Sequence, residues 1–263
     1  MSLPPIYQKR ETVQYKQGVL QPENAMVVNE IPLTVFLNDT ELATLICSPG
    51  AYKELAVGFL LSEGLLQDLS DIKEITYNEK DGLLWVETAL PVPQTENFLR
   101  RQIASCCGKG RAALYFVNDA SQLEPVQSEC LFSASLIPKL INLLEEKSAT
   151  FKLTGGVHGA ALANRENMFV MYEDIGRHNA VDRVLGYAFL NRIDTSDKIL
   201  LLSGRISSEI LIKAARRGVP LVVSRSAPTK LALELADQFG VTVVGFARGE
   251  RFSIYSHKER IIS

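Results

Sequence analysis

The chain has 263 residues, of which 46% are hydrophobic and 22% are charged, and a formal net charge of −2. This length is enough to bury a substantial core, either in one large domain or in two. The nearly balanced charge excludes a general attraction to nucleic acid or to an anionic membrane, so any anion site has to be a local cluster. No apolar run approaches the roughly 20 residues of a membrane span.

The N-terminal residues contain no hydrophobic segment of the signal-peptide type, and we therefore expect a cytoplasmic protein. The cysteines agree with this location, because disulfide frameworks belong to secreted chains. They are Cys47, Cys106, Cys107 and Cys130. Neighbours such as Cys106 and Cys107 rarely bridge each other, since the ring that they would form is strained. We expect free thiols.

The N-terminal third is predicted to be rich in β-strands and to contain one helix. Strands are expected over residues 27–28, 31–37, 42–47, 72–77 and 83–88, and residues 78–82 join the last two as a hairpin. The helix is expected over residues 51–63, with Ser48 and Pro49 as its cap and first-turn proline and Gly64 at its end. Residues 94–130 have weak periodicity and are predicted to form a linker that carries the adjacent cysteines.

Strands and helices alternate in the second half of the chain. Helices are predicted over residues 135–147, 179–191, 207–217 and 228–239, and strands over 168–172, 198–202, 219–223, 241–246 and 252–255. This order is typical of a three-layer α/β/α sandwich with a mostly parallel sheet. The sequence therefore predicts an α/β fold, α+β overall, with a smaller β-rich domain over residues 1–130 and a three-layer domain over residues 131–263.

Residues 173–182 place charges of both signs and a histidine around Gly176, between a predicted strand and a predicted helix. Open α/β sheets bind ligands at the carboxyl ends of their strands, which is where this run lies. A solvated loop with local ion pairs is the alternative. It does not explain why three more loops of the same kind follow, so we expect a site.

Each strand from 168–172 to 241–246 is followed by a loop that carries arginine. These residues are Arg177, Arg205, Arg225, Arg248 and Arg251. In a parallel sheet the loops share one edge, where guanidinium groups can bind phosphate in bidentate fashion. Two of the loops enter helix N-termini and add the hydroxyl groups of Ser203, Ser226 and Thr229. Singly each arginine is a surface charge; together they predict a site for a nucleotide or a pyrophosphate-linked cofactor.

Cys106 and Cys107 lie between a serine and two cations in a loop punctuated by glycine. Lys109 and Arg111 favour the thiolate and raise its reactivity, which indicates a nucleophilic or sulfur-carrying role. The alternative, two small and partly buried residues, is the interpretation we adopt for Cys47 and Cys130.

His158, among small residues, and His178, in the charged run, are candidate acid–base groups or phosphate donors. A lone histidine is more often structural. A zinc site of His158 with the adjacent cysteines is disfavoured, because adjacent cysteines do not readily chelate one ion and no Cys-x-x-Cys is present. No metal site is predicted.

Several segments, in order from about residue 30 to 255, resemble the FdhD family, sulfurtransferases that serve as accessory proteins for formate dehydrogenase. They are Ala-Val-Gly-Phe-Leu-Leu-Ser-Glu-Gly, the cysteine loop, Thr-Gly-Gly-Val-His-Gly-Ala-Ala, Glu-Asp-Ile-Gly-Arg-His-Asn-Ala-Val-Asp, Ser-Gly-Arg-Ile-Ser-Ser-Glu, Ser-Ala-Pro-Thr and Gly-Phe-Ala-Arg-Gly-Glu-Arg. The resemblance implies a cytoplasmic homodimer that takes persulfide sulfur from a cysteine desulfurase. It passes the sulfur to the molybdenum of bis-(molybdopterin guanine dinucleotide), which formate dehydrogenase requires.

The resemblance also implies a C-terminal domain similar to the cytidine deaminase fold, without its zinc chemistry. The family's cofactor-contacting segment falls on Phe246, Ala247, Arg248, Gly249, Glu250 and Arg251, and guanine nucleotides are expected to mimic the cofactor. Many members carry Cys-x-x-Cys before a glycine, whereas this chain has Ala104 at the first position. The match to Cys-Gly makes Cys107 the persulfide carrier and Cys106 a helper. The alternative function is a cofactor-binding chaperone without sulfur chemistry; a zinc hydrolase or deaminase rests on fold analogy alone.

Overall fold

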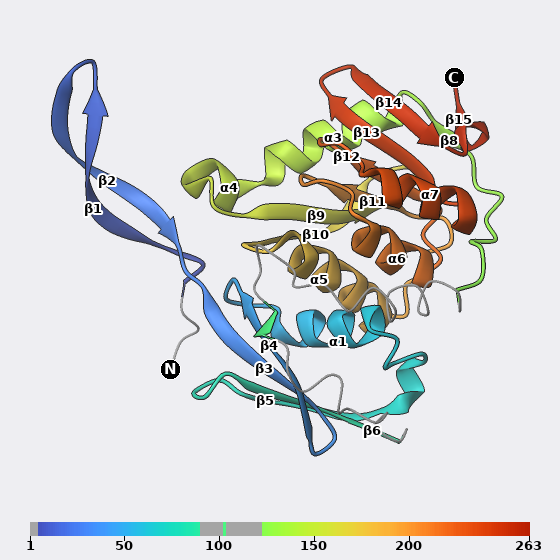
Figure 1. The fold of residues 1–263 in the computed structure, drawn as a ribbon, viewed down its shortest axis with the longest axis horizontal. Coiled ribbons are helices and arrows are strands. Elements are labelled where there is room, and N and C mark those ends of the chain that lie inside the picture. Colours follow the sequence, from blue (N-terminus) through green and yellow to red (C-terminus); the bar gives the residue numbers. More distant parts are fainter. Residues whose placement is uncertain (1–4, 90–101, 104–122) are drawn as a thin grey trace.

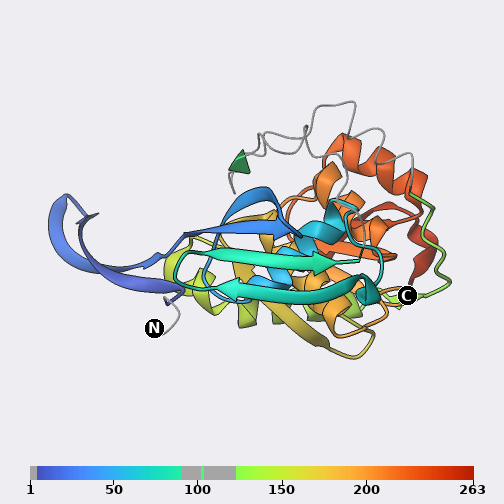
Figure 2. The ribbon, with the colours of Figure 1, turned by 90° about the horizontal axis from the view of Figure 1, so that it is seen from below.

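A computed structural model describes residues 5–89, 102–103 and 123–263 of the chain. It contains a five-stranded sheet, a six-stranded sheet and a two-stranded arm that extends away from both (Figures 1 and 2). A further short pair joins β8 (Phe132–Ser133) to β15 (Ile261–Ile262) in parallel. No helix in the described part of the chain is both long and apolar enough to cross a membrane.

The arm is an antiparallel hairpin of β1 (Tyr7–Lys16) and β2 (Val19–Val28). Its turn residues Gln17 and Gly18 have φ angles of 49° and 88°, the left-handed backbone that tight two-residue hairpins require. Only residues 27–28 of the arm were predicted as strand. The remainder was missed because its charged and amide residues weaken the strand pattern.

The five-stranded sheet has the order β5-β6-β3-β4-β7. Its strands are β3 (Ile31–Leu37), β4 (Thr40–Cys47), β5 (Ile72–Asn78), β6 (Leu83–Thr88) and β7 (Gln102–Ile103). A single turn of 3-10 helix (Leu69–Asp71) precedes β5. The predicted hairpin of β5 and β6 is confirmed, since the two strands pair antiparallel across the turn.

Helix α1 (Tyr52–Ser62) covers this sheet, close to the residues predicted for it. The predicted cap is wrong, because the helix begins after Ala51, which has a left-handed backbone with φ 45°. Ser48 instead donates its backbone N–H to Asp174 Oδ2 at 3.1 Å and accepts the N–H of Ile175 on its hydroxyl. Ser48, which was predicted to cap α1, is therefore bonded to a loop that is distant in the sequence.

The six-stranded sheet has the order β10-β9-β11-β12-β13-β14. Its strands are β9 (His158–Ala163), β10 (Met168–Asp174), β11 (Ile199–Leu202), β12 (Leu221–Ser224), β13 (Thr242–Arg248) and β14 (Arg251–Ser256). The prediction of a mostly parallel sheet is wrong, since β9 and β14 run antiparallel to their neighbours. Strand β9 was missed because its small residues indicated a close-approach loop.

Strands β10, β11, β12 and β13 nevertheless point in one direction. β11, β12 and β13 are parallel, and β10 has the same direction because both it and β11 pair antiparallel with β9. The loops after these strands therefore share one edge, as predicted. His158, the first residue of β9, pairs with Asp174 at the end of β10 and lies at that edge too.

Helices cover both faces of the six-stranded sheet. Helix α3 (Leu136–Lys147) packs on one face, and the short helix α4 (Ala149–Thr154) follows it. Helices α5 (Arg177–Leu190), α6 (Ser208–Arg216) and α7 (Lys230–Phe239) pack on the other (Figure 1). A 3-10 turn (Lys258–Arg260) lies near the C-terminus. The expected likeness to cytidine deaminases and the boundary at residue 130 stay predictions.

Helices α1 and α5 join the two sheets through a contact between their backbones. A Cβ atom on Gly58 would lie 1.8 Å from the carbonyl oxygen of Asp182, and one on Gly186 would lie 2.0 Å from that of Glu54. Glycine at both positions therefore lets the helices approach more closely than any side chain would permit.

We expect Gly186→Ala to destabilise the protein. At an open helix position the same change stabilises by about 1 kcal/mol, because alanine is the better helix former. Here the added methyl group would overlap Glu54, and overpacking of this kind costs about 1–3 kcal/mol. Denaturant titration of the variant and the wild type measures the change in the free energy of unfolding. An increase would mean that the two helices move apart to accommodate the methyl group.

Candidate functional site

The acidic residues of the charged run at 173–182 hold the fold together. Glu173 accepts the backbone N–H groups of Thr150 at 2.8 Å and Phe151 at 2.9 Å, at the start of α4. Asp182 accepts from Lys213 Nζ at 2.6 Å and from Ser62 Oγ at 2.6 Å, which connects α5 to α6 and α1. Asp182 is buried and Glu173 is partly exposed, and both carboxylates are engaged by donors of the protein itself.

Asp174 is the most connected of these acids. It is fully buried and accepts from Arg183 Nε at 3.0 Å and Nη2 at 2.8 Å, from Gly176 N–H at 2.8 Å and from Asn179 Nδ2 at 2.9 Å. Arg183, also buried, donates to the carbonyl oxygens of Ser48 and Gly50. The network fixes the turn that leads from β10 into α5.

Cys47 lies beside this network. Burial raises the pKa of the Cys47 thiol to about 12, although the Arg183 guanidinium opposes the shift. A thiol must ionise before it acts as a nucleophile, so Cys47 is inert at neutral pH, in agreement with the structural role predicted for it. Cys130 is partly buried. Cys106 and Cys107 lie outside the described residues.

The turn that Asp174 fixes directs Arg177 and His178 to the shared edge of the sheet. A Cβ atom on Gly204 would lie 3.3 Å from His158 Nδ1 and 3.5 Å from Arg177 Cβ, so the three residues are close neighbours. Ser203 Oγ is 3.5 Å from His158 Nδ1 and accepts the N–H of Gly159 at 3.0 Å. The structure thus brings together three residues predicted for the site, His158, Arg177 and Ser203. His178, the next residue along α5, faces Glu209 of α6.

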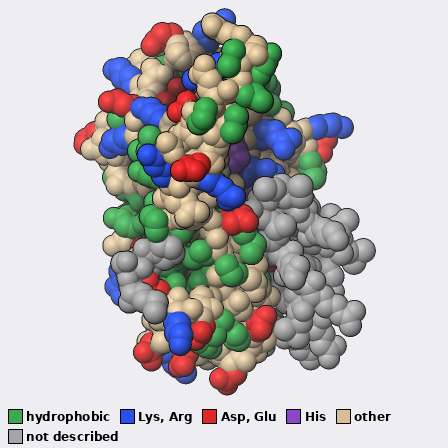
Figure 3. All heavy atoms as spheres, turned by 90° about the vertical axis from the view of Figure 1, so that its left-hand side faces the viewer, with side chains coloured by type: hydrophobic (Ala, Val, Ile, Leu, Met, Phe, Trp, Pro, Cys, Tyr) green, Lys and Arg blue, Asp and Glu red, His purple; other side chains and the backbone are tan. Residues whose placement is uncertain are grey.

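A pocket of about 310 Å³ opens at this edge. Its wall includes His158 and Ser203, together with Arg225 from the loop after β12 and with Glu145 and Lys152 from α3 and α4. Figure 3 shows a histidine recessed on this side of the molecule, with lysine and arginine side chains around it. Glu145 and Lys152 were not predicted, since only the packing of α3 and α4 against the sheet brings them here.

Both histidines are held in the neutral form. Burial lowers the pKa of His158, and the charges of Arg177 and Arg205 lower it further. Burial also lowers the pKa of His178, to about 3, with contributions from Lys213 and Arg177. Glu209 Oε2, 3.4 Å from His178 Nε2, favours the charged ring but is outweighed. The positive charge of the site therefore belongs to its arginine and lysine residues.

Arg177 has one hydrogen-bond donor that is available to a ligand. Its Nε is buried and has no hydrogen-bond partner among the described residues. A buried donor without a partner carries a free-energy cost of about 1–3 kcal/mol, which an anion at this position would relieve. Arg225 forms an ion pair with Glu145, and Arg205 is exposed to solvent.

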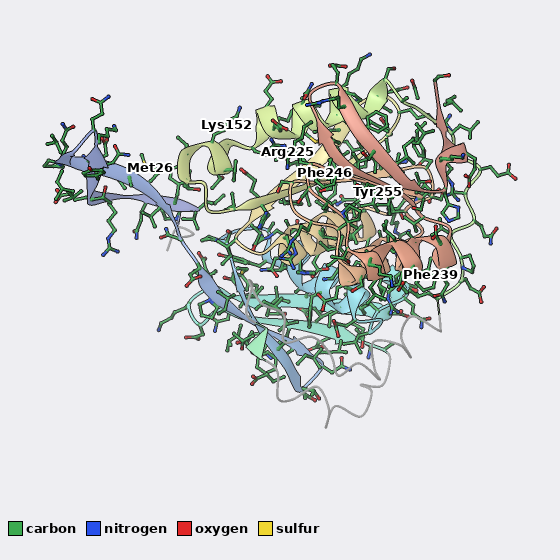
Figure 4. All side chains as sticks on the ribbon, turned by 45° about the horizontal axis from the view of Figure 1, so that its top comes forward. Met26, Lys152, Arg225, Phe239, Phe246 and Tyr255 are labelled. Atoms are coloured by element: carbon green, nitrogen blue, oxygen red, sulfur yellow. The ribbon has the colours of Figure 1, made fainter. Side chains whose placement is uncertain are left out.

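The loop after β13 is attached to the loop after β12. The N–H of Phe246 donates to Ser226 O at 3.1 Å, and Arg248 Nε donates to Arg225 O at 2.9 Å. Phe246 is 46% exposed and has a left-handed backbone with φ 51°, which is rare for an aromatic residue. Figure 4 shows Phe246 beside Arg225, with Lys152 farther along the same side.

The remaining predicted residues are distributed around this loop. Gly249 and Glu250 form the exposed turn between paired Arg248 and Arg251, whereas Ala247 is buried in the core. Thr229 caps α7 by accepting the N–H of Ala232 at 3.3 Å. Contact of these residues with a ligand stays a prediction. Among the described residues, no group of three His, Cys, Asp or Glu side chains is placed to hold a metal ion.

Comparison with known proteins relates this site to a family. Residues 28–262 match the model of the FdhD/NarQ family. The Sulfur carrier protein FdhD of Bacillus pumilus is 45% identical over 98% of both chains, and that of Geobacillus kaustophilus is 43% identical over 97% of both. A crystal structure from Desulfotalea psychrophila, described as a candidate formate dehydrogenase accessory protein, superposes with a TM-score of 0.82 at 28% identity and covers 98% of this chain and 100% of its own. The chain therefore belongs to the FdhD/NarQ family.

Proposed function

We propose that this protein is a sulfur carrier, a sulfurtransferase that receives persulfide sulfur from a cysteine desulfurase and transfers it to the molybdenum of bis-(molybdopterin guanine dinucleotide) for formate dehydrogenase. Support comes from the relatives named Sulfur carrier protein FdhD, which align over nearly the whole chain. The observation that carries the proposal is the pocket at one sheet edge, whose wall includes neutral His158 and Ser203. Next to His158, Arg177 has a buried donor without a partner among the described residues.

Cys107 is the proposed acceptor of sulfur, and Cys106 its helper. The Cys107 thiolate attacks the outer sulfur of the donor's persulfide, and the bond from that sulfur to the donor cysteine breaks. The donor leaves as a thiolate, and Cys107 now carries the sulfur. This step needs no redox partner, because one sulfur–sulfur bond replaces another.

The pocket fits part of a phosphorylated cofactor. Its volume of about 310 Å³ lies at the lower end of the range for small-molecule sites, which suits one nucleotide portion and not the whole dinucleotide. Arg225 and Lys152 of its wall, with Arg177 next to His158, are proposed to supply charge for phosphate groups, while Ser203 and His158 supply hydrogen bonds. Arg248 and Arg251 extend the positive charge beyond the pocket.

Phe246 is proposed to stack on the guanine ring. An aromatic residue held in a left-handed backbone costs about 1–3 kcal/mol, and such strain gathers at ligand sites. Its hydrogen bond to Ser226 fixes the ring next to the arginine loops, where it stays accessible. A flat face beside cations suits a base linked to phosphates.

A cofactor-binding chaperone is the second candidate. It is favoured by one observation: of the two cysteines that the structure describes, Cys47 is inert and Cys130 is not among the residues that line the pocket. The chaperone role therefore needs only residues that the structure describes. Sulfur chemistry depends on Cys106 and Cys107, and a direct assay of these residues separates the two functions.

Incubation with a desulfurase and cysteine should add about 32 Da, one sulfur atom, to the peptide that contains Cys107. Cys107→Ser should abolish the adduct because no thiolate remains to accept sulfur, whereas Cys106→Ser should retain it. Mass spectrometry of the loop peptide is the measurement, and Cys47→Ser is the control for a buried thiol. An adduct that persists in Cys107→Ser would transfer the carrier role to another residue.

Phe246→Ala should weaken binding of GDP about tenfold, because loss of base stacking costs about 1–3 kcal/mol, and leave binding of inorganic pyrophosphate unchanged. Arg248→Ala should weaken both ligands, since it removes charge. Leu231→Ala is the matched control, as Leu231 is 45% exposed against 46% for Phe246. Isothermal calorimetry measures all four proteins. Equal loss of both ligands in Phe246→Ala would refute stacking, and a wild-type protein that binds neither would refute the phosphate site.

Acid should destabilise the protein through its neutral histidines. Folding lowers the pKa of His178 from its ordinary value of 6.5 to about 3. Below pH 6.5 the unfolded chain therefore binds a proton at this residue that the folded chain does not bind. The free energy of unfolding then falls by up to about 1.4 kcal/mol per pH unit as pH drops below about 6.5. His178→Gln should reduce this slope between pH 7 and pH 5, with His158 retaining part of it. Identical slopes in denaturant titrations would contradict the assignment.

A further inference from the structure

One side chain of the pocket wall is not explained by an anion site. Of the described residues that line the pocket, Glu145 is the only acid, and it shares the wall with Lys152, His158 and Arg225. A carboxylate repels phosphate, so it lowers the affinity of the pocket for a bare anion. Its position therefore indicates that the ligand also carries a group that a carboxylate binds.

Helix α3 holds Glu145 at the pocket and leaves it accessible. The preceding residue, Leu144, is buried in the core, and Ser148 Oγ donates to the carbonyl oxygen of Leu144 at 2.7 Å. Glu145 forms an ion pair with Arg225, and its side chain is still 36% exposed. A carboxylate accepts roughly four hydrogen bonds, so the ion pair uses only part of this capacity. The remainder is available to a ligand in the pocket.

The pocket also offers apolar surface. Leu144 and Phe151 contribute to its wall, and Phe151 is 45% exposed. Phe246 lies beside Arg225 on the same side of the molecule (Figure 4). Apolar surface of this kind stabilises the flat ring of a ligand and does nothing for a bare phosphate. The wall as a whole therefore suits a ligand that combines phosphate, a flat ring and hydrogen-bond donors on that ring.

We propose that Glu145 is a specificity-determining residue, which selects a phosphorylated ligand whose ring has an N–H group next to an exocyclic amino group. The two oxygens of one carboxylate accept from such a pair of donors in parallel, as they do from the two N–H groups of an arginine fork. Guanine and pterin rings both carry this pair, whereas adenine has an acceptor in place of the ring N–H. The inference rests on the proposed function, because the phosphate groups bring the ligand to the pocket.

The first test compares two nucleotides that differ only in the base. The wild type should bind GDP about tenfold or more tightly than ADP, because adenine cannot form the charge-assisted pair of hydrogen bonds. Glu145→Gln should bind the two about equally, since the amide has the same shape but places a donor against the base. Glu146→Gln is the matched control: it removes the same charge from the next residue of α3, which is exposed, and should keep the preference for GDP. Isothermal calorimetry measures each Kd.

Inorganic pyrophosphate separates base recognition from a structural role. Glu145→Gln removes a repulsive charge, so its affinity for pyrophosphate should equal that of the wild type or exceed it by up to about threefold at low salt. A residue that only positions Arg225 would weaken pyrophosphate and GDP together when changed, and that result would overturn the proposal without contradicting the phosphate site. A wild-type protein that binds neither ligand would refute the phosphate site and this inference with it.

A pterin compound identifies which ring the carboxylate binds. The probe is 6-hydroxymethylpterin diphosphate, which carries the same number of phosphate groups as GDP. Loss of affinity for GDP in Glu145→Gln, with the pterin compound unaffected, assigns guanine to Glu145. The reverse result assigns the pterin, and loss of both shows that the shared donor pair is what the carboxylate selects. If neither compound loses affinity in Glu145→Gln, the residue does not determine specificity and the proposal is wrong.

Discussion

A carboxylate and a guanidinium group buried together, Asp174 and Arg183, determine how the two sheets meet. Removing two charges from water is expensive, and a buried pair persists only where further hydrogen bonds satisfy both groups. Here Asp174 also accepts from Ser48, Gly176 and Asn179, and Arg183 donates to the loop before α1. Loss of either partner would leave a buried charge uncompensated. The pair therefore favours this one packing of the two sheets, even if it contributes little net stability.

The same pair positions the site. Arg177 and His178 follow Asp174 by three and four residues, on the first turn of a helix whose start the network holds in place. Side chains fixed in this way bind a ligand without first being ordered, which reduces the entropy lost on binding. The contact of Gly58 and Gly186 places α1 directly against α5, the helix that begins at this turn.

Periodicity predicted the regular elements well where strands are β-branched and helices amphipathic. The helices at 135–147, 207–217 and 228–239 and the strands between them agree with the structure to within two residues at most boundaries. The common edge of the arginine loops was also predictable, because it depends only on strand direction. The strand order was not, since β9 consists of small residues and β14 returns by a tight turn. Long-range pairing of this kind leaves no local pattern.

The candidate site was predictable in part for the same reason. Arg177 follows β10, Ser203 follows β11 and His158 begins the antiparallel β9, so strand direction brings all three to one edge. Glu145 and Lys152 come from helices on the other side of the sheet and carry no pattern of their own. The charged run at 173–182 was interpreted as a site throughout, although Asp174 and Asp182 are buried and Glu173 is bound to the backbone of α4. Charge alone does not distinguish a residue that binds a ligand from one that stabilises the fold.

The buried position of Cys47 has a consequence for a protein that handles reactive sulfur. Sulfane sulfur moves to whichever thiolate reaches it first, and each additional ionised cysteine would divert it. Enclosed next to the Asp174–Arg183 pair, Cys47 remains protonated and out of reach, so the framework that shapes the fold also keeps one sulfhydryl group from competing for the cargo.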